Sequence, residues 1–264
     1  MNPNLKEVVR EELQKLLNVN FIYPTSDSQW VSPLVIVHRK NGKWRVCIDY
    51  RELNKANLKD RFPLPLIDQV LDTLAGKKNF SFLDGFSGYN KIEVAPKDQG
   101  KTTFTYPWGT YAYHVVHFGL CNALATFQRE VLRFFSNLFD DCVEMYMDDF
   151  TVYGNYFEEA HENLEKFLIT CKETNFSLHQ DLFFMMFNEG IILCHHILGN
   201  EIKVDPSKVE IISKLSIPIF QHDVNSFLGF TGYYTIFILK FTNIPSRFFK
   251  LLTKYCEFSW TFDC

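Results

Sequence analysis

The spacing of apolar residues changes several times along the chain, and each change predicts a new element. The first apolar residues form one stripe with helical spacing, so we expect a helix that opens at Asn2-Pro3. Two short apolar runs, at residues 34–37 and 44–48, then flank a polar Asn41-Gly42 turn and predict a β-hairpin.

The rest of the chain alternates strands and helices, with breaks at Pro63, Pro65, Pro218 and Pro245. This order predicts an α+β fold in which an antiparallel sheet carries helices on one face. The predicted elements are a helix over 67–74 closed by Gly76, a strand over 80–83 that ends on Asp84, a hairpin of 102–106 and 111–116, a helix capped by Asn122, a helix over 157–172, two or three strands within 176–198, and a mostly helical segment that begins at Asp205-Pro206.

Two adjacent carboxylates stand out in this pattern. Tyr146-Met147-Asp148-Asp149 lies between two apolar runs that read as short strands, so the two acids fall at a tight turn. Like charges placed there repel each other and need a counter-charge. Oxygen ligands suit a hard divalent cation, so the pattern indicates a site for Mg²⁺.

Composition limits the protein class. With 47% hydrophobic and 22% charged residues the chain is typical of globular proteins, and its 27 Phe point to large apolar interiors or to sequence drift. We predict no membrane span and no signal peptide, and therefore an intracellular protein whose compartment stays open. The seven cysteines are scattered without a C-x-x-C pair, so we expect reduced thiols.

Charge is distributed unevenly, although the net charge is only −4. Residues 36–61 carry eight Lys or Arg against three acids, whereas residues 137–165 carry nine acids and no Lys or Arg. A positive and a negative region in one chain suit a protein that grips phosphates in one place and metal ions in another. Two solvated faces without a ligand are the alternative.

Five sequence blocks, in order, resemble those of reverse transcriptases from gypsy-type LTR retrotransposons, and a sixth resembles the segment after the polymerase core. The blocks are Trp44 to Asn54, Asp60 to Pro65, Phe82 to Tyr89, Phe118 to Gln128, Tyr146 to Asp149, and Asn225 to Gly229.

The resemblance implies a right-hand polymerase with a ferredoxin-like antiparallel palm sheet. Fingers would comprise residues 1–59 and 92–126, the palm 60–91 and 127–203, and a partial thumb or the start of a connection 204–264. It implies an RNA or DNA template with its primer and dNTPs as partners. The ribonuclease H and integrase regions of the family's polyproteins are not in this sequence.

The residues of the family's two-metal site can be matched one by one to positions in this sequence. The resemblance makes Asp84 and Asp148 the pair that bridges two Mg²⁺ ions, with Mn²⁺ as a substitute, and Asp149 the third carboxylate. Without it, Asp84 would be read as a turn or helix cap.

The resemblance also assigns the nucleotide site. Arg39 and Arg45 match positions that contact the triphosphate, although basic residues also serve simply to protect a hairpin edge. Tyr89 matches the residue that excludes a ribose 2′-OH, and Phe118 a residue that contacts nucleotide and template. A core aromatic is the alternative for Tyr89.

Three residues are assigned to primer and template. Tyr146 and Met147 match positions beside the primer terminus, and Gln128, together with Asn122, lies at the base of the fingers. Core side chains are the alternative for Tyr146 and Met147.

The sequence departs from the family pattern at supporting positions. His117 and Leu124 stand where proline is usual, Leu182 where lysine is expected, and Cys194 where a glycine is usual in a hairpin. Two hypotheses therefore remain: an RNA-directed DNA polymerase, or a catalytically impaired relic that at most binds nucleic acid through residues 36–61. A phosphodiester hydrolase is disfavoured because the sequence has no His/Asp nuclease pattern.

Overall fold

The structure is a computed structural model that describes residues 3–38, 42, 44–85, 88–139, 141–179, 183–198, 201–241 and 248–252. The chain divides into two compact units, the first made of Met1–Thr73 and Asn79–Met186, the second of Leu74–Lys78 and Phe187–Cys264. The predictions for Arg39, Asn41, Leu182 and Pro245 lie outside the described residues.

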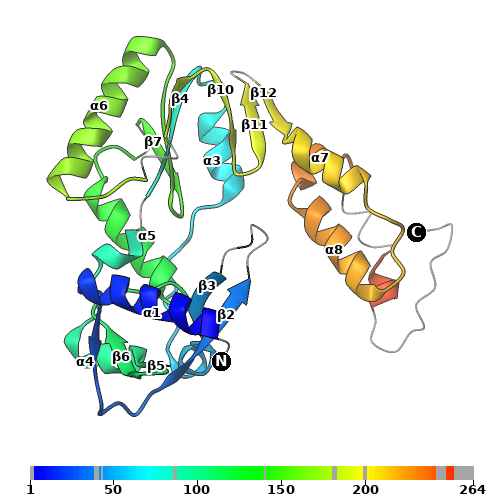
Figure 1. The fold of residues 1–264 in the computed structure, drawn as a ribbon. Helices are drawn as coiled ribbons and strands as arrows, with labels where there is room; N and C mark the ends of the chain where they lie inside the picture. The colour runs from blue at the N-terminus through cyan, green and yellow to red at the C-terminus, as the bar shows by residue number, and fades with distance from the viewer. Residues whose placement is uncertain are drawn as a thin grey trace. The chain divides into compact units, whose positions relative to one another are not determined.

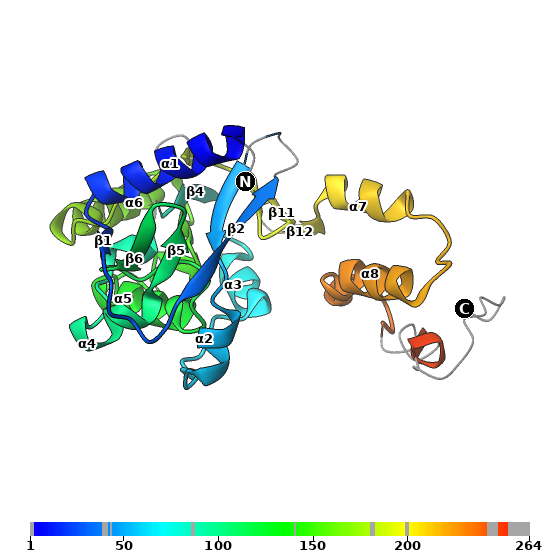
Figure 2. The same ribbon diagram turned by 60° about the horizontal axis from the view of Figure 1, so that its bottom comes forward.

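A five-stranded sheet forms one half of the first unit. Its order is β1 (Ile22–Pro24), β6 (Gly109–Tyr113), β5 (Phe104–Tyr106), β2 (Ser32–His38) and β3 (Trp44–Ile48). The pairings are antiparallel except between β2 and β5. Helix α1 (Pro3–Asn18) lies across this sheet, and its Val9 and Leu13 join the sheet's apolar core (Figure 2). The predicted opening helix and both hairpins are confirmed, with shorter strands in the second hairpin.

A four-stranded sheet forms the other half, in the order β7 (Val143–Tyr146), β8 (Asp149–Gly154), β4 (Asn79–Asp84) and β9 (Phe184–Phe187). Helices α5 (Ala123–Phe134) and α6 (Phe157–Glu173) pack on it (Figure 1). Phe127 of α5 and Phe167 of α6 are buried in one cluster with Phe150 of β8. The predicted α+β layer, an antiparallel sheet covered by helices, is therefore confirmed.

Short elements connect the two sheets. They are α2 (Arg51–Ala56), α3 (Ile67–Leu74), η1 (Gly88–Lys91), α4 (Pro96–Gln99) and η2 (Gly100–Thr102). Gly76 follows α3 with a φ of 83°, the left-handed conformation that commonly ends a helix, so its predicted role is confirmed.

The second unit contains a three-stranded sheet of β10 (Glu189–Ile192), β11 (His195–Leu198) and β12 (Glu201–Val204). After it come α7 (Pro206–Ser213), α8 (Gln221–Gly232), η4 (Thr235–Phe237) and η5 (Phe249–Leu252). The Asp205 side chain accepts a hydrogen bond of 2.8 Å from the Ser207 backbone N–H, which confirms the predicted cap of α7.

One predicted cap is wrong. Asn122 directly precedes α5, but its side chain makes no hydrogen bond to that helix. Its amide instead accepts from the Asp60 backbone N–H and donates to the Leu58 carbonyl, so a contact distant in sequence outcompetes the local cap.

The predictions on thiols and membranes can be compared with the described residues. Cys47, Cys121, Cys142, Cys171 and Cys194 are free thiols, as expected. None of the helices in the described ranges combines the length and the apolar character needed to cross a lipid bilayer.

Candidate active site

Strand pairing brings the three predicted metal carboxylates to one end of the four-stranded sheet. In the β4–β8 register Asp84 lies directly opposite Asp149, and Asp148 precedes Asp149 at the β7–β8 turn. The backbone N–H of Gly85 donates a hydrogen bond of 2.8 Å to the Asp148 carbonyl. Acids remote in the sequence are therefore neighbours in the fold.

These acids disfavour each other's charge. Burial, and then the nearby Asp84 and Asp149 carboxylates, raise the pKa of Asp148 to about 6. Burial and Asp84 likewise raise the pKa of Asp149. The Oδ1 atom of Asp148 is buried without a hydrogen-bond partner. Uncompensated negative charge and an orphaned oxygen are features that a bound cation relieves.

The side chains are neighbours without forming a finished metal site. Among the described residues, no group of three or more His, Cys, Asp or Glu is arranged so as to hold a metal ion. The donor set of carboxylate oxygens fits Mg²⁺ chemically, and the orphaned Asp148 oxygen fits a cation as well. Ligation by all three requires their side chains to turn toward one point.

The turn that carries Asp148 has an unusual backbone. Tyr146 pairs with Asp149, so only Met147 and Asp148 connect the strands. Met147 has a φ of 58°, in the left-handed region that non-glycine residues rarely adopt. Next to the turn, a Cβ added to Gly85 would lie 3.3 Å from the Asp148 carbonyl oxygen and 3.3 Å from the Phe176 ring. The glycine thus permits a close approach of β4 to the turn.

The predicted nucleotide residues form a row that leads away from the acids. Tyr89 of η1 is half-buried, and burial together with Asp148 raises its pKa to about 12. Its ring centroid lies 4.8 Å from that of Phe127 and 6.3 Å from that of Phe118. The Arg45 guanidinium on β3 lies 5.5 Å from the centre of the Phe118 ring. The structure therefore brings Arg45, Phe118 and Tyr89 together with Asp148.

The predicted primer and template residues differ in how exposed they are. Tyr146 ends β7 just before the turn, whereas Met147 lies in the turn and is exposed. Gln128 of α5 is only 3% exposed, and its Oε1 has no hydrogen-bond partner. This burial favours a role inside the base of the fingers for Gln128 rather than a direct contact with nucleic acid.

The positive region at residues 36–61 is partly neutralised in the described segment. Arg51 pairs with Asp49 at 2.5 Å, and Lys55 with Glu52 at 2.7 Å. These pairs are exposed at the basic side chain and contribute little to stability, so a phosphate can replace the carboxylate partner at small cost.

Sequence reasoning identified His117 only as a departure from a pattern. Its ring packs against the Tyr50 and Tyr113 rings, at centroid distances of 6.2 and 4.3 Å. Burial, with a smaller contribution from Arg45, lowers its pKa to about 4, so the imidazole is neutral at pH 7. Asn54, whose side chain holds the loop after Phe118, was missed because nothing in its local sequence distinguishes it.

Comparisons with known proteins place the chain in a family. The family described as "Reverse transcriptase (RNA-dependent DNA polymerase)" matches residues 37–231. The chain is 34% identical to a retrovirus-related Pol polyprotein from transposon 412 of Drosophila melanogaster, over 98% of this chain and 21% of the relative. It is 31% identical to the corresponding polyprotein from transposon gypsy of the same organism, over 91% of this chain and 24% of the relative.

The fold is also similar to a solved structure. A foamy viral protease-reverse transcriptase in complex with double-stranded DNA superposes with a TM-score of 0.89 at 20% identity, over 99% of this chain and 46% of that one. Because the identity is low, this similarity supports the fold alone. The chain spans 21% and 24% of the lengths of the two curated relatives.

Proposed function

The chain belongs to the reverse transcriptase family, and we propose that it is an RNA-directed DNA polymerase that adds dNTPs to a primer 3′-OH on an RNA or DNA template. The observation that carries the proposal is the β4–β8 register, which places Asp84 opposite Asp149 and beside Asp148. These are the acids that the family resemblance assigns to the metal site.

We propose Asp84, Asp148 and Asp149 as the ligands of two Mg²⁺ ions, for which Mn²⁺ can substitute. Bound divalent cations would supply charge neutralisation at the attacking and leaving oxygens. The carboxylates must be ionised to bind a cation, and the pKa of Asp148 is raised to about 6. Metal affinity should therefore increase as the pH rises through about 6.

We assign the incoming nucleotide to the row of Arg45, Phe118 and Tyr89. The Arg45 guanidinium offers charge-assisted hydrogen bonds to a triphosphate, and Arg39 is proposed for the same role on sequence grounds. Tyr89 lies between Phe118 and the acids, where a bulky ring excludes a ribose 2′-OH. A Tyr89→Ala variant should incorporate rNTPs more readily, and unchanged rNTP/dNTP discrimination would contradict the assignment.

We keep fingers at 1–59 and 92–126, palm at 60–91 and 127–203, and thumb or connection from 204 as a proposal. Two separate apolar clusters, one around α1 and its sheet and one around α5 and α6, support distinct fingers and palm. The proposed palm includes most of the β10–β12 sheet. In the division into compact units, this sheet belongs to the second unit, together with the segment that follows the proposed palm.

Primer extension on poly(rA)/oligo(dT) tests the polymerase directly. The chain should extend the primer with Mg²⁺, and Asp148→Asn should abolish extension because it removes a ligand charge. Asp141→Asn is the matched control, since Asp141 is an exposed acid that precedes β7, at the end of the strand away from the turn, and should tolerate the change. Extension that is absent, or equal in the chain and in Asp148→Asn, would remove the proposal.

The second candidate is nucleic-acid binding without polymerisation. It is favoured by the departures from the family pattern at the supporting positions His117, Leu124 and Cys194. Filter binding over a salt titration separates the two, because contacts between basic side chains and phosphates give a steep decrease of affinity with salt. Salt-dependent binding without extension would select this candidate.

A further inference from the structure

Two asparagines tie the loop at residues 117–122 to the segment at 49–60. The Asn54 side chain, on α2, donates to the Gly119 carbonyl and accepts from the Cys121 backbone N–H, both at 2.8 Å. The Asn122 side chain donates to the Leu58 carbonyl at 2.9 Å and accepts from the Asp60 backbone N–H at 3.0 Å. We call Asn54 and Asn122 the asparagine clasp.

The clasp binds each side chain to two backbone groups of the other segment. An amide offers a donor at one end and an acceptor at the other, and both ends of both residues are engaged. Each segment therefore contributes one asparagine and receives hydrogen bonds from the other. This reciprocity fixes the spacing between the two segments and their register.

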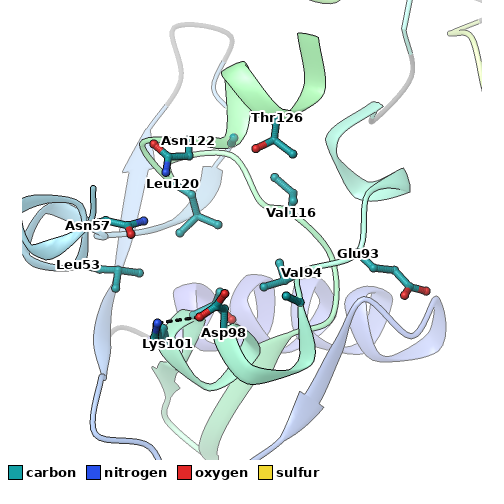
Figure 3. Close-up of a pocket in the computed structure, with 13 residues that line it drawn as sticks. Leu53, Asn57, Glu93, Val94, Asp98, Lys101, Val116, Leu120, Asn122 and Thr126 are labelled. Carbon is teal, nitrogen blue, oxygen red and sulfur yellow. Dashed lines mark hydrogen bonds and ion pairs between the residues drawn. The ribbon is translucent and has the colours of Figure 1, made fainter. Parts of the chain in front are cut away.

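Packing alone does not hold the loop. A cavity of about 350 Å³ lies beside it, and Figure 3 shows the Leu120 side chain pointing into this space. Gly119 has a φ of 104°, in a region that glycine adopts freely, so this residue does not by itself fix the shape of the loop. His117 packs against the Tyr50 and Tyr113 rings at the start of the loop. Beyond it, where Leu120 faces the cavity, the hydrogen bonds of the clasp restrain the backbone. Lining residues include Leu53, Asn57, Val94, Lys101, Val116 and Leu120.

The loop carries the residue at the centre of the nucleotide row. Phe118 is 63% exposed, and its ring centroid lies 5.5 Å from the Arg45 guanidinium and 6.3 Å from the centroid of the Tyr89 ring. A side chain that is this exposed is held mainly through its backbone. A shift of Gly119 would therefore move Phe118 relative to Arg45 and Tyr89.

We propose that the asparagine clasp positions the 117–122 loop for dNTP binding, so that Asn54 and Asn122 are positioning residues of the polymerase. The inference rests on the proposed function. Its alternative is a purely structural role, in which the clasp only stabilises the attachment of α2.

Steady-state kinetics on a primed template separate the two roles. Asn54→Ala removes both bonds to the loop and should raise the KM for dNTP about tenfold while kcat changes less than about twofold, because nucleotide binding is weakened and the metal acids are untouched. Asn54→Asp keeps the acceptor for Cys121 but sets a carboxylate against the Gly119 carbonyl. It should raise the KM at least as much.

Asn163→Ala is the matched control. Asn163 is buried, and its side chain donates at 2.9 Å to the Tyr153 carbonyl, away from the loop. This variant should lower the Tm and leave the KM unchanged. Amide hydrogen exchange at Cys121 should accelerate in Asn54→Ala and stay slow in Asn163→Ala, which shows that the clasp was opened.

The outcomes distinguish this inference from the proposed function. Faster exchange at Cys121 with an unchanged KM in both Asn54 variants would overturn the inference and leave the polymerase intact. If the chain does not extend primers, the dissociation constant of a fluorescent dNTP replaces the KM. Weaker binding in the Asn54 variants then supports the clasp, whereas equal binding, or no binding by the unaltered chain, overturns it.

Discussion

The β7–β8 and β10–β11 hairpins are both closed by two residues, and both hold non-glycine residues at positive φ. In the first, only Met147 has a positive φ, of 58°, the pattern of a type II′ turn. In the second, Leu193 and Cys194 have φ values of 47° and 59°, the pattern of a type I′ turn. Each such residue costs about 1 kcal/mol relative to glycine.

Different contacts maintain the two turns. The first is held by the Gly85 backbone and carries an acid whose pKa is raised by burial and, to a smaller extent, by the neighbouring acids. The second is held by tyrosine hydroxyls, because Tyr233 donates to the Leu193 carbonyl and Tyr234 to the Cys194 carbonyl. We infer that the strained backbone of the first turn is needed to position Asp148 for catalysis. In the second turn the strain arises because a non-glycine residue occupies a position where glycine would be more stable.

The largest expected difference between the turns is catalytic. Asp148→Asn should lower the rate of primer extension by about 10³-fold or more, the scale of losing a key electrostatic group. Cys194→Ser, at the other turn, should change the rate less than about twofold. The rates are measured by primer extension at saturating dNTP. Comparable losses of rate in the two variants would show that the two turns do not differ in their importance for catalysis.

The pH dependence of stability should differ as well. The folded pKa of Asp148, about 6, exceeds the ordinary value of 3.8, so the folded state binds the extra proton and its stability decreases as the pH rises from about 4 to about 6. In EDTA, Asp148→Asn removes this term, and its unfolding free energy relative to the unaltered chain should increase by about 2 kcal/mol over that window. Urea denaturation at several pH values measures it, and a pH-independent difference would contradict the charge repulsion.

The tyrosine contacts of the second turn should contribute a smaller amount. Tyr233→Phe and Tyr234→Phe each remove one hydroxyl bond to a turn carbonyl and should destabilise the fold by about 1 kcal/mol. Primer extension should persist in both. A loss of activity larger than the loss of folded protein would show that the second turn also serves the chemistry.

Glycine substitutions give the smallest and most direct comparison. Cys194→Gly should stabilise the chain by about 1 kcal/mol without reducing primer extension, because it relieves the positive φ. Met147→Gly relieves the same cost but loosens the backbone next to Asp148, so extension should decrease while stability does not. If the two variants behave equally in urea denaturation and in primer extension, the proposed difference between the turns is wrong.

The sequence predicted the features that depend on local pattern. The strand that ends on Asp84 and the turn at Asp148 follow from short apolar runs and a tandem acid, and both are confirmed. The expectation that Cys194 occupies a position suited to glycine is also confirmed by its φ of 59°.

Features that depend on distant contacts were not predictable in this way. Asn122 carries a local cap signal, yet its amide binds Leu58 and Asp60. Asn54 has no local signal at all, and its role emerges only when α2 meets the 117–122 loop. Hydrogen bonds to segments distant in the sequence therefore determine the position of both side chains.

The abundance of phenylalanine has two explanations, as the composition suggested. Some of these residues fill the core between the four-stranded sheet and its helices, where the ring centroids of Phe135, Phe150 and Phe167 lie 5.0–5.6 Å apart. Others, such as Phe184 and Phe220, are exposed at 53% and 66%. The exposed residues agree with drift, and the buried ones with a large apolar interior.

The pairing of β4 with β8 also governs when the acids assemble during folding. Asp84 is made long before Asp149, and the two meet only after the intervening segment has formed a loop and the strands have paired. Chains halted before β8 would carry Asp84 and Asp148 without Asp149. The third acid therefore joins the other two only when β8 has paired with β4.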